Sequence, residues 1–238
     1  MTRARPALEL IDVHAAYGRI EVLRGVSLVV PKGSVFALLG PNGAGKTTTL
    51  RVASGALKSR SGCLHVGGNH VNGANVSALV RAGVCTVPEG RAIFPNLTVE
   101  DNLWVMTHTR GQRPRDVRER AYAAFPVLGE RRRQLAGTLS GGEQKMLSLA
   151  RALATDPDLL LLDEISMGLA PRIVGELYES VAKLAAQGIS LLIVEQFARM
   201  ALSVADVAAV MTHGRIQTMG EPSEIDAALS DAYLGGAA

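Results

Sequence analysis

The segment Gly40–Thr47 constrains the fold more than any other part of this sequence. Its residues, GPNGAGKT, fit the pattern GxxxxGK[ST] and lie between the apolar stretch 34–40 and residues 48–53, which have a helical pattern. In such a setting the backbone N–H groups of a glycine-rich turn surround phosphate oxygens, and the start of the following helix adds partial positive charge. The sequence therefore predicts a phosphate-binding loop between a strand and a helix.

The residues of this loop have predicted places around a nucleotide. Lys46 is expected to bridge the β- and γ-phosphates, and the Thr47 hydroxyl to ligate Mg²⁺. A glycine-rich turn that matches the pattern by chance is the alternative, and the flanking strand and helix argue against it. The pattern does not separate kinases, GTPases and ATPases. The residues expected to bind nucleotide here are Gly40, Pro41, Asn42, Gly43, Ala44, Gly45, Lys46, Thr47 and Thr48.

A second apolar run, 159–162, is followed by the adjacent carboxylates of Asp163 and Glu164. Neighbouring side chains at the end of a strand diverge. Asp163 is therefore expected to hold the Mg²⁺ shell, while Glu164 faces a water near the γ-phosphate as general base or water orienter. An acidic pair after a core strand is common, so the pair gains its weight from its position relative to another segment, LSGGEQ at 139–144.

Ser140 lies at the predicted start of a helix and is followed by two glycines. The free N–H groups and the hydroxyl at such a position form an anion-binding site that has no lysine of its own. The structural alternative is a capped helix, in which Ser140 is the N-cap and Glu143, the third helical residue, closes a capping box. Both interpretations can hold together, because the cap that stabilises the helix start also directs its free N–H groups toward an anion.

Apolar runs and helical segments alternate along most of the chain, which predicts the α/β class. The runs are expected to be buried strands, because helices cover both faces of a parallel sheet. The clearest helix is expected over 171–187, with Pro171 at its start and Gly188 just past its end. The predicted buried strands are 34–40, 84–89, 158–164 and 190–196.

Two segments depart from this alternation. The first 35 residues have strand-like patterns joined by turn residues, which predicts an antiparallel patch before the first strand–helix unit. Between Glu89 and Ser140 the pattern is helical, with a start resembling a capping box at Thr98 and Asp101, so a helical lobe is expected between core strands.

Composition and charge narrow the function classes. The 25 basic and 22 acidic residues leave a net charge of +3, which is too small to indicate nucleic-acid binding. Cys63 and Cys85 form no CxxC pair and the five histidines are scattered, so neither disulfides nor a zinc site is predicted. The N-terminus lacks the apolar run of a signal peptide, and no stretch reaches the ~18 apolar residues of a membrane span. We therefore expect a cytosolic chain, in which any membrane role would come through a partner.

The sequence resembles the ABC ATPase family over nearly its whole length. The motifs that carry the resemblance are the phosphate loop, LSGGEQ, LARAL at 149–153 and LLLLDE. The resemblance implies a P-loop NTPase (RecA-like) core with an antiparallel β patch and an inserted α-helical lobe. The single domain would span 1–238, with the core at 1–88 and 150–238 and the lobe at 89–149. ATP and Mg²⁺ are the implied ligands.

The same resemblance implies a subunit arrangement. Two ATPase subunits would pair head to tail, and the signature segment of each would contact the nucleotide held by the other. Tyr17 would stack on adenine, although from the residues alone it would be an ordinary half-buried strand residue. The signature residues expected to act across the pair are Leu139, Ser140, Gly141, Gly142, Glu143 and Gln144.

Several positions depart from the family pattern. Glu89 stands where the family usually has glutamine; it can reach Mg²⁺ or its waters but adds negative charge beside phosphates. Gln196 occupies the position where the family usually has its switch histidine. Glutamine can hydrogen-bond a γ-phosphate oxygen, but it cannot take a proton. Ile165 replaces a proline, and Ala170 an aspartate. Glu89 is thus a candidate metal ligand and Gln196 a candidate catalytic residue.

Four segments resemble the second ATPase of branched-chain amino-acid importers and of related urea or short-amide importers. They are 88–103, 166–171, VEQ at 194–196 and AYLGG at 232–236. This implies membrane permease subunits, a second ATPase in a homo- or heterodimer and, indirectly, a solute-binding protein, with no nucleic acid. The chain would lie peripherally on the cytoplasmic face of the membrane. A soluble ABC ATPase of translation, DNA repair or regulation is the alternative, and LSGGEQ argues against a GTPase or a small-molecule kinase.

The resemblance also suggests where a permease would bind. Importer ATPases receive a short permease helix in a groove beside the helical lobe, and the candidates here are Glu89, Arg91, Phe94 and Pro95. The equally weighted alternative is that IFPNL packs the lobe onto the core. For the arginines at 131–133, a solvated charged turn is preferred over a lipid or permease contact.

Overall fold

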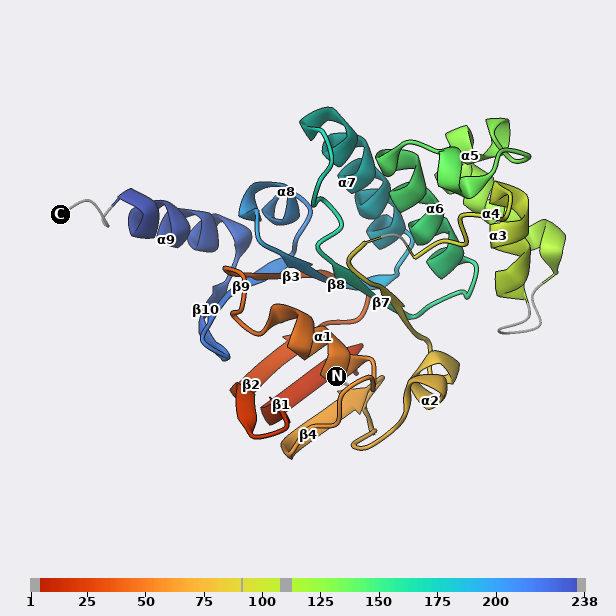
Figure 1. Cartoon of the computed structure of the whole chain (residues 1–238). Helices are drawn as coiled ribbons and strands as arrows, with labels where there is room; N and C mark the ends of the chain where they lie inside the picture. The colour runs from red at the N-terminus through yellow and green to blue at the C-terminus, as the bar shows by residue number, and fades with distance from the viewer. Residues whose placement is uncertain (1–4, 91, 108–112, 235–238) are drawn as a thin grey trace.

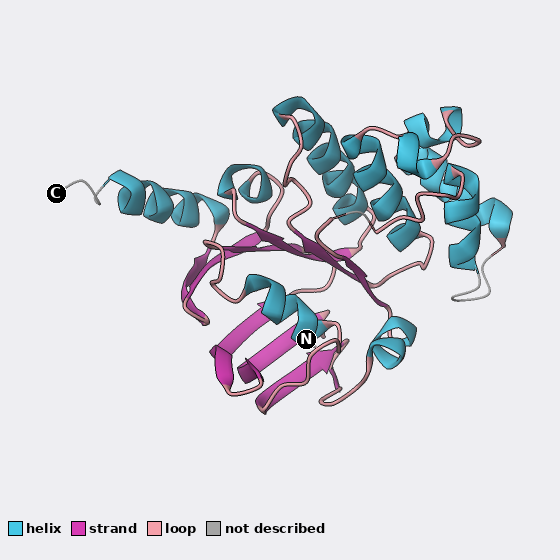
Figure 2. Ribbon diagram, in the orientation of Figure 1, coloured by secondary structure: helices cyan, strands magenta, loops and turns pink. Residues whose placement is uncertain are grey.

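The computed structural model describes residues 5–90, 92–107 and 113–234. It contains two sheets with helices between and beside them (Figures 1 and 2). In chain order the elements are β1 Leu8–Tyr17, β2 Ile20–Val30, β3 Val35–Leu39, α1 Lys46–Ala53, β4 Ser61–Val66, β5 Asn69–His70, α2 Val76–Arg81, β6 Val84–Val87, α3 Val99–Met106, α4 Pro114–Ala124, α5 Pro126–Glu130, the 3₁₀ helix η2 Ala136–Thr138, α6 Gly141–Leu153, β7 Leu159–Asp163, α7 Pro171–Ala186, β8 Ser190–Glu195, α8 Ala198–Leu202, β9 Val207–Thr212, β10 Arg215–Gly220 and α9 Pro222–Leu234.

The larger sheet has six strands in the order β10-β9-β3-β8-β7-β6. Neighbouring strands from β9 to β6 are parallel, and the edge strand β10 pairs antiparallel with β9. Successive residues of these strands face opposite sides: Leu191 and Ile193 belong to one core, and Leu192 and Val194 to the other. Both faces are buried, which confirms the α/β class and explains why these strands are continuous apolar runs.

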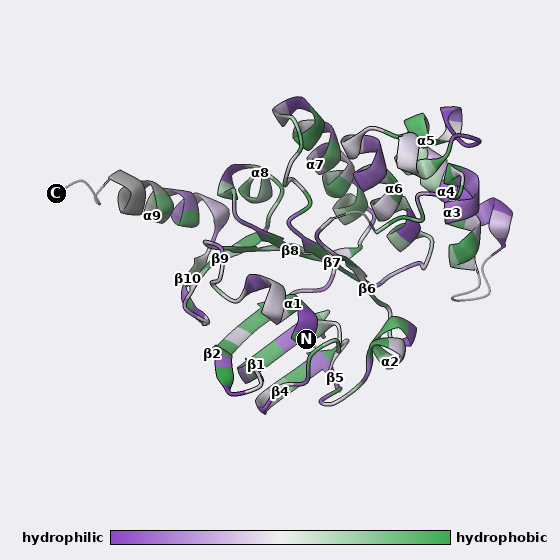
Figure 3. Ribbon diagram, viewed as in Figure 1, coloured by the Kyte–Doolittle hydropathy of each residue, from purple (hydrophilic) through white to green (hydrophobic). Residues whose placement is uncertain are grey.

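Two layers cover the two faces of this sheet. Helix α1 lies between the six-stranded sheet and the smaller sheet, while α6, α7 and α8 lie on the opposite face (Figure 1). The hydrophobic colouring of Figure 3 follows the strands where these layers meet. The carboxyl ends of β3, β7 and β8 therefore come to one edge, beside the start of α1.

The smaller sheet is the antiparallel patch expected near the N-terminus. Its order is β2-β1-β4-β5, and β1 pairs with both β2 and β4. The patch was predicted from the first 35 residues, which supply β1 and β2. The sequence did not reveal that β4 and β5 extend it, because that pairing joins Leu8 to Val66 across a large separation in the chain.

Two of the helices between β6 and β7, α3 and α6, begin at well-formed caps. Thr98 and Asp101 form a capping box at α3, and Ser140 and Glu143 form a second one at α6. Both boxes were predicted. The division of the chain at 88/89 and 149/150 stays a prediction, and α6 continues across the second of these positions to Leu153.

Helix α7 matches its predicted span, because it runs from Pro171 to Ala186 with Gln187 at its C-cap. On the face of α7 that packs on the core, Tyr178 is almost fully buried, whereas Ile173 is only partly buried. Helix α1 begins at Lys46, two residues before the predicted start, because Gly45 serves as its N-cap. Within the described ranges no helix is long and apolar enough to span a membrane.

Leu192→Ala should lower the free energy of unfolding by about 2 to 5 kcal/mol, because Leu192 is fully buried in the central strand β8 and its loss leaves a cavity. Urea unfolding followed by circular dichroism measures this change. Ile20→Ala is the matched control: that side chain is 73% exposed, so the change should stay within about 0.5 kcal/mol. Equal losses in the two variants would contradict the assignment of β8 to the centre of the core.

Candidate functional site

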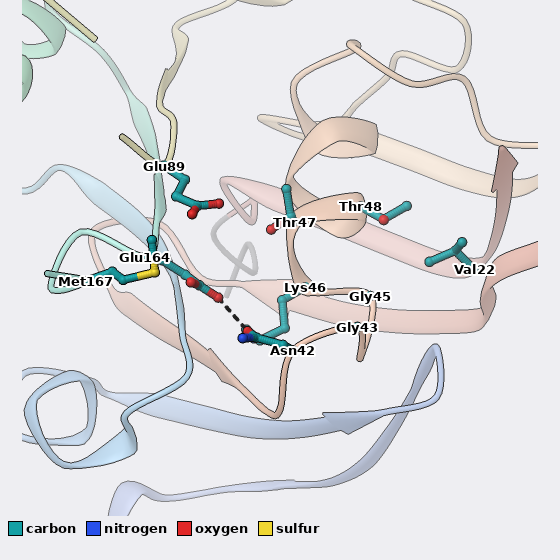
Figure 4. Close-up of a pocket in the computed structure, with 10 residues that line it drawn as sticks. All are labelled: Val22, Asn42, Gly43, Gly45, Lys46, Thr47, Thr48, Glu89, Glu164 and Met167. Carbon is teal, nitrogen blue, oxygen red and sulfur yellow. Dashed lines mark ion pairs between the residues drawn. The ribbon is translucent and has the colours of Figure 1, made fainter. Parts of the chain in front are cut away.

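A pocket of about 310 Å³ lies where α1 begins and where β3 and β7 end. The residues that line it come from distant parts of the sequence, and the carboxylate of Glu164 points toward Lys46 (Figure 4). Eight of the lining residues were predicted site residues, and Val22 and Met167 were not. The lining consists of Val22, Asn42, Gly43, Gly45, Lys46, Thr47, Thr48, Glu89, Glu164 and Met167.

The glycines of the loop are required by its backbone. Gly45, at the N-cap of α1, has a φ of 109°, a conformation that side-chain-bearing residues rarely adopt. A Cβ added at Gly40 would lie 2.2 Å from the carbonyl oxygen of Met211, so the loop packs directly on β9. Pro41 and Ala44 complete the loop. The N–H groups at the start of α1 are thereby free to face an anion.

Lys46 holds the loop around its own ammonium group. The Nζ atom donates hydrogen bonds to the carbonyl oxygens of Gly40 at 2.8 Å and Pro41 at 3.2 Å. It also forms an ion pair with Glu164 Oε1 at 3.3 Å, drawn as the dashed line in Figure 4. Only 4% of Lys46 is exposed. The ammonium is a buried cation satisfied entirely by oxygen atoms.

Thr47 and Asp163 form a second polar contact at the pocket. The Thr47 hydroxyl donates to Asp163 Oδ1 at 3.1 Å, and both residues line a second cavity that shares Thr47 and Glu89 with the first. Burial raises the pKa of the Asp163 carboxyl, the hydrogen bond from Thr47 lowers it, and the nearby charges of Glu164 and Glu89 raise it.

These oxygen atoms suit a hard cation. Hydroxyl and carboxylate oxygens are the ligands of Mg²⁺, which usually takes only one or two protein groups and completes its shell with waters and phosphates. Within the part of the chain that the structure describes, no group of three or more acidic, histidine or cysteine side chains could hold a metal unaided. The Thr47–Asp163 pair therefore fits Mg²⁺ that arrives with a nucleotide.

Glu164 has an unusual backbone. Its φ is +43°, in the left-handed region that costs a residue with a side chain about 1 to 2 kcal/mol. Its N–H donates to the carbonyl oxygen of Val194 at 2.9 Å, which ties it to the end of β8. The turn directs the carboxylate into the pocket, where it meets Lys46 (Figure 4).

Glu195, the last residue of β8, was not among the predicted site residues. Its carboxylate is 1% exposed and accepts hydrogen bonds from Ser166 and from the hydroxyl of Tyr178. Burial raises the pKa of Glu195, while the hydrogen bonds from Ser166 and Tyr178 lower it. A glutamate at the end of an apolar strand was the signal in the sequence, because a buried carboxylate needs specific partners.

Tyr17 and Gln196 are among the predicted residues that do not line this pocket. Tyr17 is 40% exposed, and its hydroxyl accepts a hydrogen bond from Arg51 Nη1 at 2.9 Å. Gln196 is exposed just beyond β8. The structure therefore leaves the predicted roles of Tyr17 and Gln196 as predictions.

The signature segment also lies outside the lining of this pocket. Its polar groups serve the start of α6: the Ser140 N–H donates to Glu143 Oε2 at 2.8 Å, and the Gln144 amide donates to the carbonyl oxygen of Leu139 at 2.9 Å. Arg131 forms an ion pair with Glu143 at 2.7 Å, so it is more than a solvated turn residue. A chain that holds these groups away from its own pocket is compatible with their predicted role in a second subunit.

The predicted permease groove is partly described. Phe94 is tied to α3 through Asn102, whose side chain accepts from the Phe94 N–H at 2.8 Å and donates to its carbonyl at 2.9 Å. The ring remains partly exposed beneath the Arg151 guanidinium, at 4.5 Å. Arg91 lies outside the described residues, as do the last two residues of AYLGG. The loop is therefore packed on the lobe, and the groove stays a prediction.

Comparison with known proteins places this chain in a family. The ABC transporter family model matches residues 23–166. The branched-chain amino acid transport ATP-binding protein BraG of Pseudomonas aeruginosa is 41% identical, over 96% of this chain and 100% of its own length. The probable branched-chain amino acid transport protein LivF of Archaeoglobus fulgidus is 32% identical, over 92% and 93% of the two chains. The ADP conformation of the ABC transporter cassette MJ1267 superposes with a TM-score of 0.86 at 29% identity, covering 95% of each chain.

Asp163→Asn should raise the free energy of unfolding of the nucleotide-free chain at about pH 7 to 8. A carboxyl whose folded pKa lies above its unfolded pKa stabilises the fold below the unfolded pKa and loses that contribution as pH rises through the folded pKa. Burial raises the pKa of Asp163, so the gain from the substitution should shrink as pH falls. Urea unfolding in EDTA at a series of pH values measures it.

Asp226→Asn is the control for this experiment, because Asp226 is an exposed residue of α9 and its substitution should alter stability little at any pH. If the wild-type chain is more stable than Asp163→Asn at the alkaline end, burial of the charged carboxylate does not cost the fold stability.

Proposed function

Because the chain belongs to the ABC transporter family and is one of its ATPases, we propose that it energises a membrane importer for branched-chain amino acids. The full-length similarity to the Pseudomonas protein of that transport class carries the proposal. An importer of urea or short-chain amides is the alternative of the same architecture, and a soluble ABC ATPase is a more distant one. The amino acid would contact the permeases and a solute-binding protein rather than this chain.

ATP would bind with its phosphates at the loop Gly40–Thr48. The N–H groups at the start of α1 face this position, and the Lys46 ammonium would exchange its carbonyl and Glu164 contacts for β- and γ-phosphate oxygens. Mg²⁺, held by Thr47 and Asp163 with Glu89 near its waters, would neutralise charge on these phosphates. Binding would thereby release Glu164 from its ion pair with Lys46.

Glu164 is then the general base. Its carboxylate accepts a proton from a water as the water oxygen attacks the γ-phosphorus, and the bond from that phosphorus to the leaving ADP oxygen breaks. Lys46 stabilises the charge on the phosphoryl oxygens. Gln196 would donate a hydrogen bond to a γ-phosphate oxygen from the end of β8, after a movement that brings it to the pocket.

The second subunit would complete the site. Residues Leu139 to Gln144 of one ATPase, with the capped start of α6, would face the γ-phosphate held by the other. The second ATPase is either another copy of this chain or a related subunit. Tyr17 would stack on adenine, because its ring is exposed at the end of β1. The assembly would join membrane permeases from the cytoplasmic face and bind no nucleic acid.

Glu164→Gln should lower kcat for ATP hydrolysis by at least about 100-fold while ATP still binds, because the amide cannot accept a proton. Phosphate release by the chain with its co-purified partner subunits measures kcat, and a fluorescent ATP analogue measures binding. Glu179→Gln is the matched control: Glu179 is exposed on α7, so both quantities should stay near wild type. Unchanged turnover in Glu164→Gln would remove Glu164 from the role of base.

Purification from membranes should recover permease subunits with the chain. A proteoliposome containing that complex and its binding protein should couple ATP hydrolysis to uptake of leucine, isoleucine or valine. Uptake of urea or a short amide instead would establish the alternative importer. Recovery of the chain without any membrane protein would favour a soluble ABC ATPase.

Gln196→His in the same complex tests the departure at the switch position. If glutamine tunes this site, the histidine variant should lose most transport-coupled ATPase activity, since histidine changes both the charge and the hydrogen bonding at the γ-phosphate. Activity within about twofold of wild type would show that glutamine and histidine both support hydrolysis at this position, because a twofold change in rate corresponds to less than about 0.5 kcal/mol in the activation barrier.

A further inference from the structure

The turn after Glu164 is held to the end of β8 by side-chain as well as backbone hydrogen bonds. The Ser166 N–H donates to Glu195 Oε1 at 3.0 Å, and the Ser166 hydroxyl donates to Glu195 Oε2 at 2.9 Å. Together with the bond from the Glu164 N–H to Val194, these contacts fix the chain on both sides of Ile165, which is itself fully buried.

A third donor reaches the same carboxylate from another element. The Tyr178 hydroxyl, on α7, donates to Glu195 Oε1 at 3.0 Å, and Tyr178 is 1% exposed. Glu195 therefore joins β8, the turn that follows β7, and α7. Both of its oxygens have partners, so the carboxylate meets the condition under which burial of a charge is tolerated.

Stability alone does not explain this arrangement. A buried charge can usually be replaced by well-packed apolar groups at no net loss of stability, whereas removal of one partner is costly. The neighbouring residues of β8 are all apolar, from Leu191 to Val194, so an apolar side chain at 195 would continue the pattern. The acid stands instead where it can accept two hydrogen bonds from the turn after Glu164.

The strained backbone of Glu164 explains why the hydrogen bonds between Glu195 and Ser166 matter. A residue with a left-handed backbone keeps that conformation only when its surroundings hold it there. Val194 fixes the N–H of Glu164, and Glu195 fixes residue 166 with both a backbone and a side-chain bond. Loss of the second anchor would let the turn relax and redirect the Glu164 carboxylate.

A buried cation on α6 adds to the electrostatics of this cluster. Lys145 is 7% exposed, and its Nζ atom has no hydrogen-bond partner within the described structure. Burial lowers the pKa of Lys145, and the charge of Glu195, followed by those of Glu89, Asp163 and Glu164, opposes this effect. The helix that begins at the signature segment thus places a positive charge near Glu195.

We propose that Glu195 is a positioning residue for ATP hydrolysis, whose buried carboxylate clamps the turn 164–167 and so aims Glu164 at the attacking water. The inference rests on the proposed role of Glu164 as the general base. Glu195 itself contacts neither the nucleotide nor the water. Its removal should therefore lower kcat and leave ATP binding intact, because the loop and Lys46 keep their own contacts.

Single-atom variants of the two donors test the clamp in the full chain with its co-purified partners. Tyr178→Phe and Ser166→Ala should each lower kcat about 10-fold, and the double variant about 100-fold, while ATP affinity stays within about 2-fold, because a small misplacement of a catalytic group costs rate rather than binding. Ser166→Thr keeps the hydroxyl and should restore most of kcat. Hydrogen exchange at residues 166–169 should speed up in Ser166→Ala.

Tyr122→Phe is the matched control, because the Tyr122 hydroxyl is buried without a hydrogen-bond partner in the described structure and lies in the helical lobe. Its kcat should equal that of wild type. Glu195→Gln provides an independent variant: its amide oxygen can keep the two bonds made to Oε1, but its NH2 group faces the Ser166 hydroxyl in place of an acceptor, so kcat should fall with little change in ATP affinity.

The outcomes separate this inference from the role of Glu164. If Glu164→Gln abolishes turnover but Tyr178→Phe and Ser166→Ala keep wild-type kcat, the clamp is wrong and the ATPase mechanism stands. Normal turnover in Glu164→Gln would show that Glu164 is not the general base, and the proposed role of Glu195 in aiming it would then be wrong as well. A loss of unfolding free energy with unchanged kcat, measured where each variant is folded, would show that Glu195 is only structural.

Discussion

Burial of opposite charges at the carboxyl ends of β3 and β7, on either side of β8, is the constraint on which the site depends. The Lys46 ammonium and the carboxylates of Asp163 and Glu164 are each less than a tenth exposed. Each has a hydrogen-bond or ion-pair partner, as groups in a medium of low dielectric constant require. With Glu89 in the same pocket, acids outnumber the lysine, so a divalent cation suits the charge of the site as well as that of the nucleotide.

Burial of these charges lowers the folding stability of the chain, and the rest of the fold offsets that cost. Apolar cores on both faces of the six-stranded sheet hold β3, β7 and β8 rigidly enough to keep Glu164 in a left-handed conformation and Gly40 against β9. The site is therefore preorganised by this packing together with the hydrogen bonds that hold the loop and the turn after β7. A chain with the same loop but a weaker sheet would relax toward a structure in which these charges separate into water.

The sequence revealed the features that depend on residues close together in the chain. The phosphate loop, the buried strands and both capping boxes each need fewer than about 15 residues to be recognised. The partners of Glu195 could not be found in this way, because Ser166 and Tyr178 lie 29 and 17 residues from it and become its neighbours only through the strand order. The extension of the antiparallel patch by β4 was missed for the same reason. The ion pair of Arg131 with Glu143 was missed because it depends on how the turn after α5 packs against the start of α6.

The strand order also has a consequence for how the chain acquires its site during synthesis. The strands that carry the phosphate loop and Asp163, β3 and β7, are both complete once residue 163 has been made, yet they are not neighbours in the sheet. Between them lies β8, which begins only at Ser190. A nascent chain shorter than this has both halves of the nucleotide pocket but no strand to register one against the other. ATP can therefore be held as in the finished protein only after most of the chain has left the ribosome.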